Sequence, residues 1–438
     1  MFKKIFSPIF IFIIAISHIS AQNYTSYFTG DVSDVVVQPL FGIALAGGAG
    51  DNDDAMQWFL ERANGGDVLV LRSSGADGYN DYFYSELGVT VNSVETIVCN
   101  NAGASNEEYV ITQIQNAEAI FFAGGDQSNY INYWKDSPVE DAINDHMLIK
   151  QGPVGGTSAG MAILGGHYFS AENGTVYSEE ALENPYNTYM TIGHHDFLQT
   201  PFLQDVITDT HYDDPDRRGR HMAFLARIYA DGYPQALGIA CEEFTCVCID
   251  ETGLAHVYGE HPEFEDYAFF LRHACDEPWT PENCVANQPL TWERNENALY
   301  VLKSPGTVAG THIFSLTDWL SWNGGDWQEW WVTDGIFDVN EVSFGPDCPL
   351  DVVASIADNT REDQVYVYPN PASQNVSISS SKQTKRITIF DVTGAAIVTL
   401  FSPVTSALID IHHLCPGIYP FVITNDDGSR SAGKLVVE

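Results

Sequence analysis

The sequence predicts an α/β fold, with a doubly wound, mostly parallel sheet followed by a small all-β sandwich. Short apolar runs alternate with helix-like segments from Phe41 to Ser158, which is typical of a parallel sheet covered by helices on both faces. Beyond Gln364 there are only short alternating runs separated by turn residues, which indicate a sandwich. Charge separates the two parts, because the net charge of −40 falls entirely before Gln364, and the acids and bases of the tail balance.

The alternation defines the predicted elements in order. Strands are expected at 41–45, 67–71, 93–98 and 119–122 and just before Ser158, and helices at 54–63, 107–116, 128–134 and 139–149. Ligands of such sheets bind outside the carboxyl ends of the strands, so the site is expected in the loops there. After about residue 260 the sequence becomes rich in tryptophan and turns, and we interpret its aromatic residues as packing.

The N-terminus and the overall charge limit where the protein acts. Residues 1–21 have two lysines, an apolar run and a small-residue cleavage site, so they are predicted to be a secretory signal. No later run is long enough to span a bilayer, so no membrane span is expected after signal removal. The negative charge argues against nucleic acid or an anionic membrane as a partner.

Eight cysteines in an exported chain allow disulfides. We expect Cys275 and Cys284 to pair, because Pro278, Pro281 and Asn283 between them suggest a loop that a bridge would close. The cysteines at 241, 246 and 248 lack a second matched pair of metal ligands, so they are expected to be buried thiols or to form a local disulfide.

The segment Gly155-Gly-Thr-Ser-Ala-Gly160 is predicted to form a strand, a tight turn with Ser158 at its tip, and a helix. A serine hydroxyl needs a base and donors for an oxyanion, and the backbone N–H of Ala159 is one such donor. The alternative is that this segment is merely a glycine-rich turn into a helix and that Ser158 is not a nucleophile. Two more loops follow predicted strands, Gly47-Gly-Ala-Gly50 and Gly124-Gly-Asp-Gln127. No Lys-Ser or Lys-Thr follows the first, which argues against nucleotide binding.

The base is predicted to be His211, which ends a strand-like stretch and has Asp209 on the same face. The other histidines considered are His146, His167, His194, His195 and His221. Neighbouring histidines on a strand point to opposite faces, so His194 and His195 are expected to be structural or surface residues. The arginines at 217, 218 and 220 can recognise a substrate carboxylate or pair with Asp213, Asp214 and Asp216.

These motifs, with Asp-x-His followed by Arg-x-Gly-Arg, resemble the cyanophycinase and dipeptidase E group of serine peptidases over residues 40–260, and more weakly to 345. The resemblance implies a class I glutamine-amidotransferase-like fold in which Ser158 attacks a carbonyl, His211 is the base and an acid orients it. We assign that acid to Glu180, with Glu179 as its rival and Glu172 as a third candidate. The implied substrate-binding or oxyanion residues are Gly125, Gln127, Ala159, Asp209, Arg217 and Arg220. Two residues depart from the cyanophycinase pattern, Thr210 in place of glutamine and Pro215 in place of an arginine, and both argue against cyanophycin itself as substrate.

The tail resembles the C-terminal sorting domain of the type IX secretion system, through Val367-Tyr-Pro-Asn-Pro371, Ile389-Phe-Asp-Val-Thr-Gly394, Gly417-Ile-Tyr419 and Lys434-Leu-Val-Val437. The resemblance implies export through the periplasm to the exterior or the cell surface, with the secretion machinery as a partner. The predicted domains are therefore a signal (1–21), a peptidase domain (24–345, core 40–260), a linker (346–363) and a sorting sandwich (364–438).

Together these features predict an exported serine peptidase that hydrolyses peptide or isopeptide bonds next to aspartyl residues, without cofactor or metal. The number of subunits is open, and a homodimer is one candidate. Two other functions remain: a non-catalytic surface protein that retains the fold, and a metal-dependent hydrolase built on His194, His211 and Asp209.

Overall fold

The computed structural model describes residues 22–350 and, in the tail, 365–368, 375–390, 396–412, 414–425 and 430–437. The predicted signal segment and most of the predicted linker lie outside these residues. The helices are α1 (Asp53–Glu61), α2 (Gly78–Asp81), α3 (Glu108–Asn116), α4 (Gln127–Trp134), α5 (Pro138–Asp145), α6 (Ala159–Ala162), α7 (Ser178–Glu183) and α8 (Arg218–Ala230). Among the described residues, none of the helices has both the length and the apolar character needed to cross a bilayer.

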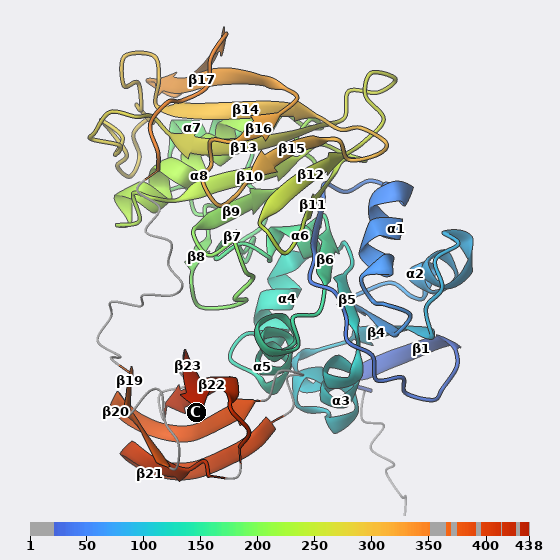
Figure 1. Ribbon diagram of the computed structural model, residues 1–438. Coiled ribbons are helices and arrows are strands. Elements are labelled where there is room, and N and C mark those ends of the chain that lie inside the picture. Colours follow the sequence, from blue (N-terminus) through green and yellow to red (C-terminus); the bar gives the residue numbers. More distant parts are fainter. Residues whose placement is uncertain are drawn as a thin grey trace, which may run out of the picture.

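The first sheet has the strand order β1-β4-β3-β5-β6-β2-β11-β12-β15-β16 (Figure 1). Its strands are β1 (Tyr24–Gly30), β2 (Ile43–Ala46), β3 (Asp67–Arg72), β4 (Ser93–Cys99), β5 (Ala119–Phe122), β6 (Val154–Thr157), β11 (Cys246–Ile249), β12 (Leu254–Tyr258), β15 (His312–Ser315) and β16 (Trp322–Asn323). The run from β4 to β2 is parallel, as the βα alternation predicts, and antiparallel strands extend it on both sides.

Helices cover both faces of the parallel region, because successive side chains of each strand point to opposite faces. On one face Val70 and Phe121 pack with Met56 and Phe59 of α1. On the other face the alternate residues of the same strands pack against helices α3, α4 and α5. Helix α1 begins at a side-chain cap, because Asn52 accepts a hydrogen bond from the Ala55 backbone N–H. The predicted doubly wound core is therefore confirmed.

The second sheet has the order β18-β17-β14-β13-β10-β9-β7-β8. Its strands are β7 (His167–Phe169), β8 (Ile192–His194), β9 (Val206–Asp209), β10 (Leu237–Cys241), β13 (Tyr267–His273), β14 (Leu299–Pro305), β17 (Asp326–Thr333) and β18 (Ile336–Val342). One face packs on α7 and α8. The other joins the core of the first sheet, where the rings of Phe270 and Phe314 stack at 4.4 Å between centroids. Several of the tryptophans lie in these cores, as expected for packing residues.

The tail forms a separate all-β sheet, as predicted. Its strands are β19 (Val365–Tyr368), β20 (Asn375–Phe390), β21 (Ala396–Asp410), β22 (Gly417–Asn425) and β23 (Arg430–Val437), in the order β19-β20-β22-β23 with β21 paired to β20. Its apolar core, which includes Val376, Ile387 and Phe421, is made of residues of the tail alone.

The predicted Cys275–Cys284 disulfide is wrong, because Cys275 pairs with Cys348 across a Cα–Cα distance of 5.6 Å. Cys284 is a free thiol. Asn283, the residue before Cys284, forms a β-bridge with Thr291. The cysteines at 241, 246 and 248 are buried free thiols, which is one of the two expected states. Cys348 falls in the predicted linker, so the start of that segment is tied to the second sheet.

Candidate active site

Three loops meet where adjacent parallel strands of the first sheet end. In the register of the sheet, Ala46 of β2 is paired with Thr157 of β6, and Phe122 of β5 with Gly156 of β6. The turn at Ser158 therefore lies between the Gly47 loop and the Gly124 loop. These are the three loops that the sequence places at the strand ends, and a side chain on any of them can contribute to one site.

Ser158 occupies a strained turn. Its backbone has φ +53° and ψ −118°, a conformation that a non-glycine residue adopts only when its surroundings hold it there. The turn requires glycines on either side, because a Cβ on Gly156 would lie 2.4 Å from the carbonyl oxygen of Gly160. Ala159 is the first residue of α6, so its N–H is one of the donors that the helix itself leaves without an acceptor.

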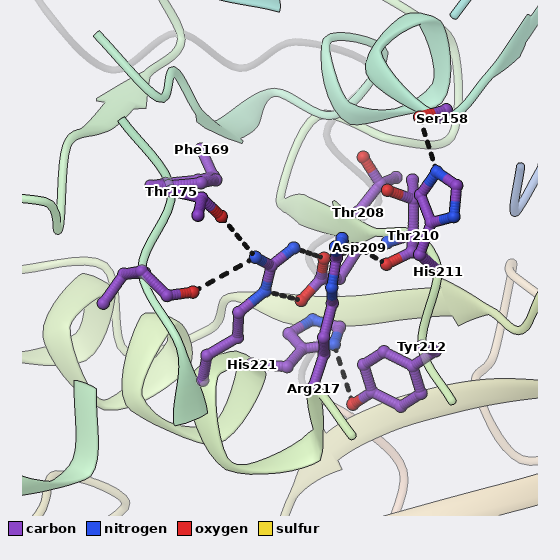
Figure 2. A network of polar contacts seen from close by, with 12 residues as sticks. Ser158, Phe169, Thr175, Thr208, Asp209, Thr210, His211, Tyr212, Arg217 and His221 are labelled. Atoms are coloured by element: carbon purple, nitrogen blue, oxygen red, sulfur yellow. Dashed lines mark hydrogen bonds and ion pairs between the residues drawn. The ribbon is translucent and has the colours of Figure 1, made fainter. Parts of the chain in front are cut away.

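His211 comes from the second sheet and reaches Ser158. It follows β9, and its backbone N–H donates to the Gly47 carbonyl at 2.9 Å. Its Nε2 lies 2.7 Å from Ser158 Oγ, and the two side chains face each other in Figure 2. The backbone of Gly48 lies against the His211 ring, since a Cβ there would be 2.5 Å from Nε2. The nucleophile and base that the sequence predicts are thus within hydrogen-bond reach.

The carboxylate at the far side of His211 belongs to Glu243, not to Glu180. The distance from His211 Nδ1 to Glu243 Oε1 is 2.6 Å. Glu180 instead accepts a hydrogen bond at 3.1 Å from the Tyr177 backbone N–H at the start of α7. Its rival Glu179 is exposed, and Glu172 accepts from the Ser170 hydroxyl at 3.4 Å.

The topology explains why Glu243 takes this place. Strands β9 and β10 are parallel neighbours, with Ala240 paired to Asp209, so the residues that follow both strands emerge at one edge. Glu243 lies in the turn after β10, and His211 lies just after β9. The sequence does contain one signal for Glu243, because a carboxylate follows a buried strand closely. Only the pairing of β9 with β10 shows that this carboxylate lies beside His211.

Asp209 and Arg220 form a buried pair instead of lining the site. Arg220 Nε donates to Asp209 Oδ2 at 2.9 Å, a second guanidinium N–H donates to Oδ1, and both side chains are at most 4% exposed. Burial by itself raises the pKa of Asp209, but the charge and hydrogen bonds of Arg220 outweigh it, so the pKa lies below its ordinary value. This pair fixes the end of β9 onto α8, where the sequence predicts contact with substrate.

Arg217 is the arginine that remains for a ligand. Its Nη1 donates to the Thr210 carbonyl at 2.8 Å, and no ion pair among the described residues involves its guanidinium. Burial, and next the charge of Arg220, lower the pKa of Arg217. Arg218 pairs with Asp216, which matches the internal pairing considered for this cluster.

The other residues that the sequence singles out form hydrogen bonds within the protein. Gln127 begins α4, and its amide donates to the Phe169 carbonyl at 3.4 Å. His146 and His221 are buried and bonded to the Pro153 carbonyl and the Tyr212 hydroxyl, which makes both structural. A metal site built from His194, His211 and Asp209 is wrong, because Asp209 is held by Arg220 and His211 lies between Ser158 and Glu243.

Sequence comparisons place the chain among known peptidases. Residues 72–252 match the model of peptidase family S51, and residues 366–438 match the secretion system C-terminal sorting domain. A cyanophycinase of Geminocystis herdmanii is 26% identical over 231 residues, which cover 50% of this chain and 77% of that protein. A cyanophycinase of Trichormus variabilis is 26% identical over 208 residues, which cover 48% of this chain and 62% of that protein.

Among solved structures, a peptidase from an acI-B1 Actinobacterium aligns with a TM-score of 0.39 and 13% identity, covering 57% of this chain and 98% of that one. A putative peptidase E protein from Listeria monocytogenes aligns with a TM-score of 0.33 and 13% identity, covering 50% and 99%. Because both TM-scores are low, the assignment of a peptidase domain is based on the sequence matches alone. These matches support a serine-type peptidase domain of family S51 at residues 72–252 and a secretion-system sorting domain at residues 366–438, and the sorting domain indicates a secreted or cell-surface protein.

Proposed function

We propose that this exported peptidase hydrolyses peptide or isopeptide bonds next to aspartyl residues, with Ser158 as nucleophile, His211 as base and Glu243 as the orienting acid. The observation that carries the proposal is the continuous hydrogen-bonded chain from Ser158 Oγ through His211 to Glu243, with steps of 2.7 and 2.6 Å. Each group in such a chain has a definite task in acyl transfer.

The tautomer follows from the chain of contacts. An ionised Glu243 accepts the Nδ1–H of His211, which leaves Nε2 with a lone pair to take the proton of Ser158 as the hydroxyl attacks the carbonyl. The imidazolium that forms is stabilised by the same carboxylate, and it then protonates the leaving amine. Water repeats the sequence on the acyl-enzyme and releases the acid product.

The oxyanion is assigned to backbone donors beside Ser158. The N–H of Ala159 starts α6 directly after the nucleophile, and Gly125 belongs to the loop after β5 next to that turn. A donor pair fixed before the reaction starts is worth several kcal/mol in the transition state, about 3–4 for one donor of this kind.

Substrate choice is assigned to Arg217. Its guanidinium has one N–H bonded to the Thr210 carbonyl, just before the catalytic His211, and has donors left for a carboxylate. A substrate with an acidic side chain or a free carboxylate beside the scissile bond would meet this charge. Thr210 is buried, and its carbonyl positions Arg217. Pro215 removes an arginine that the cyanophycinase pattern contains, so Asp-Xaa peptides are proposed ahead of β-aspartyl-arginine polymer.

The direct test is Ser158→Ala, with hydrolysis of Asp-Xaa dipeptides and of β-aspartyl-arginine polymer followed side by side. We expect turnover of Asp-Xaa peptides by the wild type and a loss of at least about 10³-fold in the variant, with unchanged circular dichroism. The matched control is Ser85→Ala, since the exposed Ser85 hydroxyl donates only to the Asp81 carbonyl within its own helical turn. Full activity in Ser158→Ala would overturn the proposal.

The export route is proposed from the tail. The matched sorting domain supports recognition by the type IX secretion machinery. The non-catalytic alternative has less support, because a binding protein has no need for the strained turn at Ser158 or for Glu243 at His211. A protein that binds Asp-Xaa peptides without cleaving them would favour that alternative.

A further inference from the structure

A cluster of histidines and aspartates lies apart from the Ser158 site, where β7 and β8 pair at the edge of the second sheet. His167 and His194 are cross-strand partners. At His195 the backbone turns left-handed, with φ +52°, so strand alternation ends there. The ring of His195 consequently lies over His167 with centroids 4.5 Å apart, where the sequence predicts that it points away from the ring of His194. Both adjacent histidines therefore contact the same buried ring.

Three side chains of this cluster are close enough to one another to bind a single metal ion. One ligand atom each from His167, His195 and Asp205 lies within 4.8 Å of the other two. His195 Nε2 and Asp205 Oδ1 lie 3.5 Å apart. Tetrahedral zinc with bonds of about 2.0–2.2 Å places its ligand atoms about 3.4 Å apart. The His195 ring is exposed, so a small movement of it would bring the three ligand atoms to the separation that zinc requires.

His167 supplies an independent indication. Its side chain is fully buried, and its Nε2 has no hydrogen-bond partner among the described residues. A buried polar atom without a partner destabilises the fold, so a ligand at this nitrogen would remove that cost.

The neighbours of His167 fix the tautomer that a metal needs. The Nδ1 atoms of His167 and His194 are 3.0 Å apart, so one donates and the other accepts. His194 Nε2 lies 3.7 Å from Asp231 Oδ2, which favours the proton of His194 on Nε2. His194 Nδ1 is then the acceptor, His167 Nδ1–H the donor, and His167 Nε2 carries the lone pair. A hydrogen bond from the second ring nitrogen to an outer partner is the usual support of a metal-bound histidine.

We propose that His167, His195 and Asp205 bind one divalent transition-metal ion, with zinc as the best fit. Two imidazoles and one carboxylate suit zinc and disfavour calcium or magnesium, which take oxygen ligands. Asp205 precedes β9, whereas His211 follows it, so the ion lies at the opposite end of that strand from the catalytic base. Its role is structural: it ties β7, the end of β8 and the start of β9 together.

The test uses the mature full-length protein, stripped with a chelator and titrated with Zn²⁺ by calorimetry. The variants are His195→Gln and Asp205→Asn, whose side chains are partly exposed, at 37% and 47%, so the fold should persist. The matched control is His256→Gln. His256 and Asp250 form a similar pair, with Nε2 and Oδ2 also 3.5 Å apart, but they lie on β12 and the turn before it.

We expect wild type and His256→Gln to bind one Zn²⁺ equally and to gain thermal stability with it. Each cluster variant should lose at least about tenfold in affinity and most of the gain in melting temperature. Absence of zinc binding in the wild type, or equal binding in both cluster variants, would overturn the proposal. Ca²⁺ that binds the same cluster as tightly as Zn²⁺ would overturn the assignment to a transition metal.

Discussion

At the scale of single residues, the account depends on which carboxylate serves His211. Glu243→Gln keeps the size of the side chain but turns an acceptor into an amide that can donate, so the imidazole can settle in the wrong tautomer. We expect kcat to fall about 10³- to 10⁴-fold, with little change in KM. Steady-state kinetics on an Asp-Xaa peptide measures this.

The matched variant is Glu180→Gln, which alters only the hydrogen bond to the Tyr177 N–H at the start of α7. It should keep kcat within a few-fold of the wild type. If Glu180→Gln were inactive and Glu243→Gln active, the triad would have to be reassigned.

Arg217→Met tests substrate recognition. Loss of a charge-assisted hydrogen bond costs about 1.5–3 kcal/mol, so kcat/KM for a substrate with an acidic residue should fall about 10- to 100-fold. Hydrolysis of a substrate without that carboxylate should change far less. Arg218→Met is the control, because Arg218 pairs with Asp216. Equal losses on acidic and neutral substrates would contradict the role given to Arg217.

The sequence predicts residues that lie in local motifs and misses one that does not. Ser158 stands in a glycine-rich turn and His211 in an Asp-x-His stretch, so each has a recognisable neighbourhood. Glu243 stands in no such motif, because it only follows a buried strand, and the pairing of β9 with β10 is what brings it to His211. Asp209 and Arg220 belong to the motifs, yet they pair with each other in the interior, which no local pattern could distinguish from a role in binding.

At the scale of elements, the Gly47 loop holds His211 in place. Gly48 has φ +113°, and a Cβ there would lie 2.5 Å from His211 Nε2. Gly48→Ala should therefore push the ring off Ser158 and reduce kcat at least about 10²-fold. Gly65→Ala is the matched control, since Gly65 has φ +78° with nothing within 4 Å of an added Cβ.

Circular dichroism and kinetics on both variants separate backbone strain from the contact with His211. Both substitutions place a side chain at positive φ, so both should lower stability, and Gly48→Ala should lower it more because its Cβ also meets the His211 ring. Only Gly48→Ala should lose activity. Equal activity in the two variants would show that the ring does not depend on this loop.

The turn between β10 and β11 also contains a carboxyl that should make stability depend on pH. Burial, and next the charge of Asp213, raise the pKa of Glu242 to about 8 from its ordinary 4.5. The folded state thus holds this proton more tightly than the unfolded state. The contribution of the neutral carboxyl to the free energy of unfolding is fully present below its ordinary pKa of 4.5, and it is lost as pH rises from there through about 8.

Glu242→Gln removes that ionisation while its amide oxygen can still accept from the Tyr267 N–H. Urea unfolding at pH 5, 6.5 and 8 measures the free energy of unfolding of both proteins. The free energy of unfolding of the variant, relative to that of the wild type, should increase steadily as pH rises. A difference that stays constant with pH would contradict the raised pKa.

Elements with strong periodicity were predictable, and irregular ones were not. The parallel strands and helices of the first sheet lie within a few residues of their predicted bounds, since apolar alternation marks them. The left-handed residue His195 and the bridge of Asn283 with Thr291 carry no such mark. The predicted disulfide and the predicted orientation of the histidines failed at those positions.

At the scale of the whole molecule, the site is shared between two sheets. Ser158 belongs to the first sheet, whereas His211 and Glu243 follow strands of the second. A common apolar core joins the sheets, and Phe270 of the second stacks on Phe314 of the first. The 2.7 Å contact of Ser158 with His211 therefore depends on how these sheets pack, which explains why the sequence could predict the two residues but not their distance.

The Cys275–Cys348 disulfide closes a long loop, with a sequence separation of 73 residues. Replacing both cysteines by serine should lower the free energy of unfolding by about 2–4 kcal/mol, mainly because the unfolded chain gains freedom. Cys284→Ser, which removes a free thiol, should have a much smaller effect. Urea denaturation compares the variants, and equal losses would contradict the pairing.

The central claim is that the serine at the strained turn is activated by a base from the other sheet. Intact-mass and peptide mass spectrometry after treatment with a fluorophosphonate tests it most directly, because such reagents phosphonylate a serine, with loss of fluoride, only when its hydroxyl is activated. The account predicts one adduct per chain, located on Ser158, and a rate of labelling that falls steeply in His211→Ala. A protein that takes up no adduct, or takes it up at the same rate without His211, would contradict it.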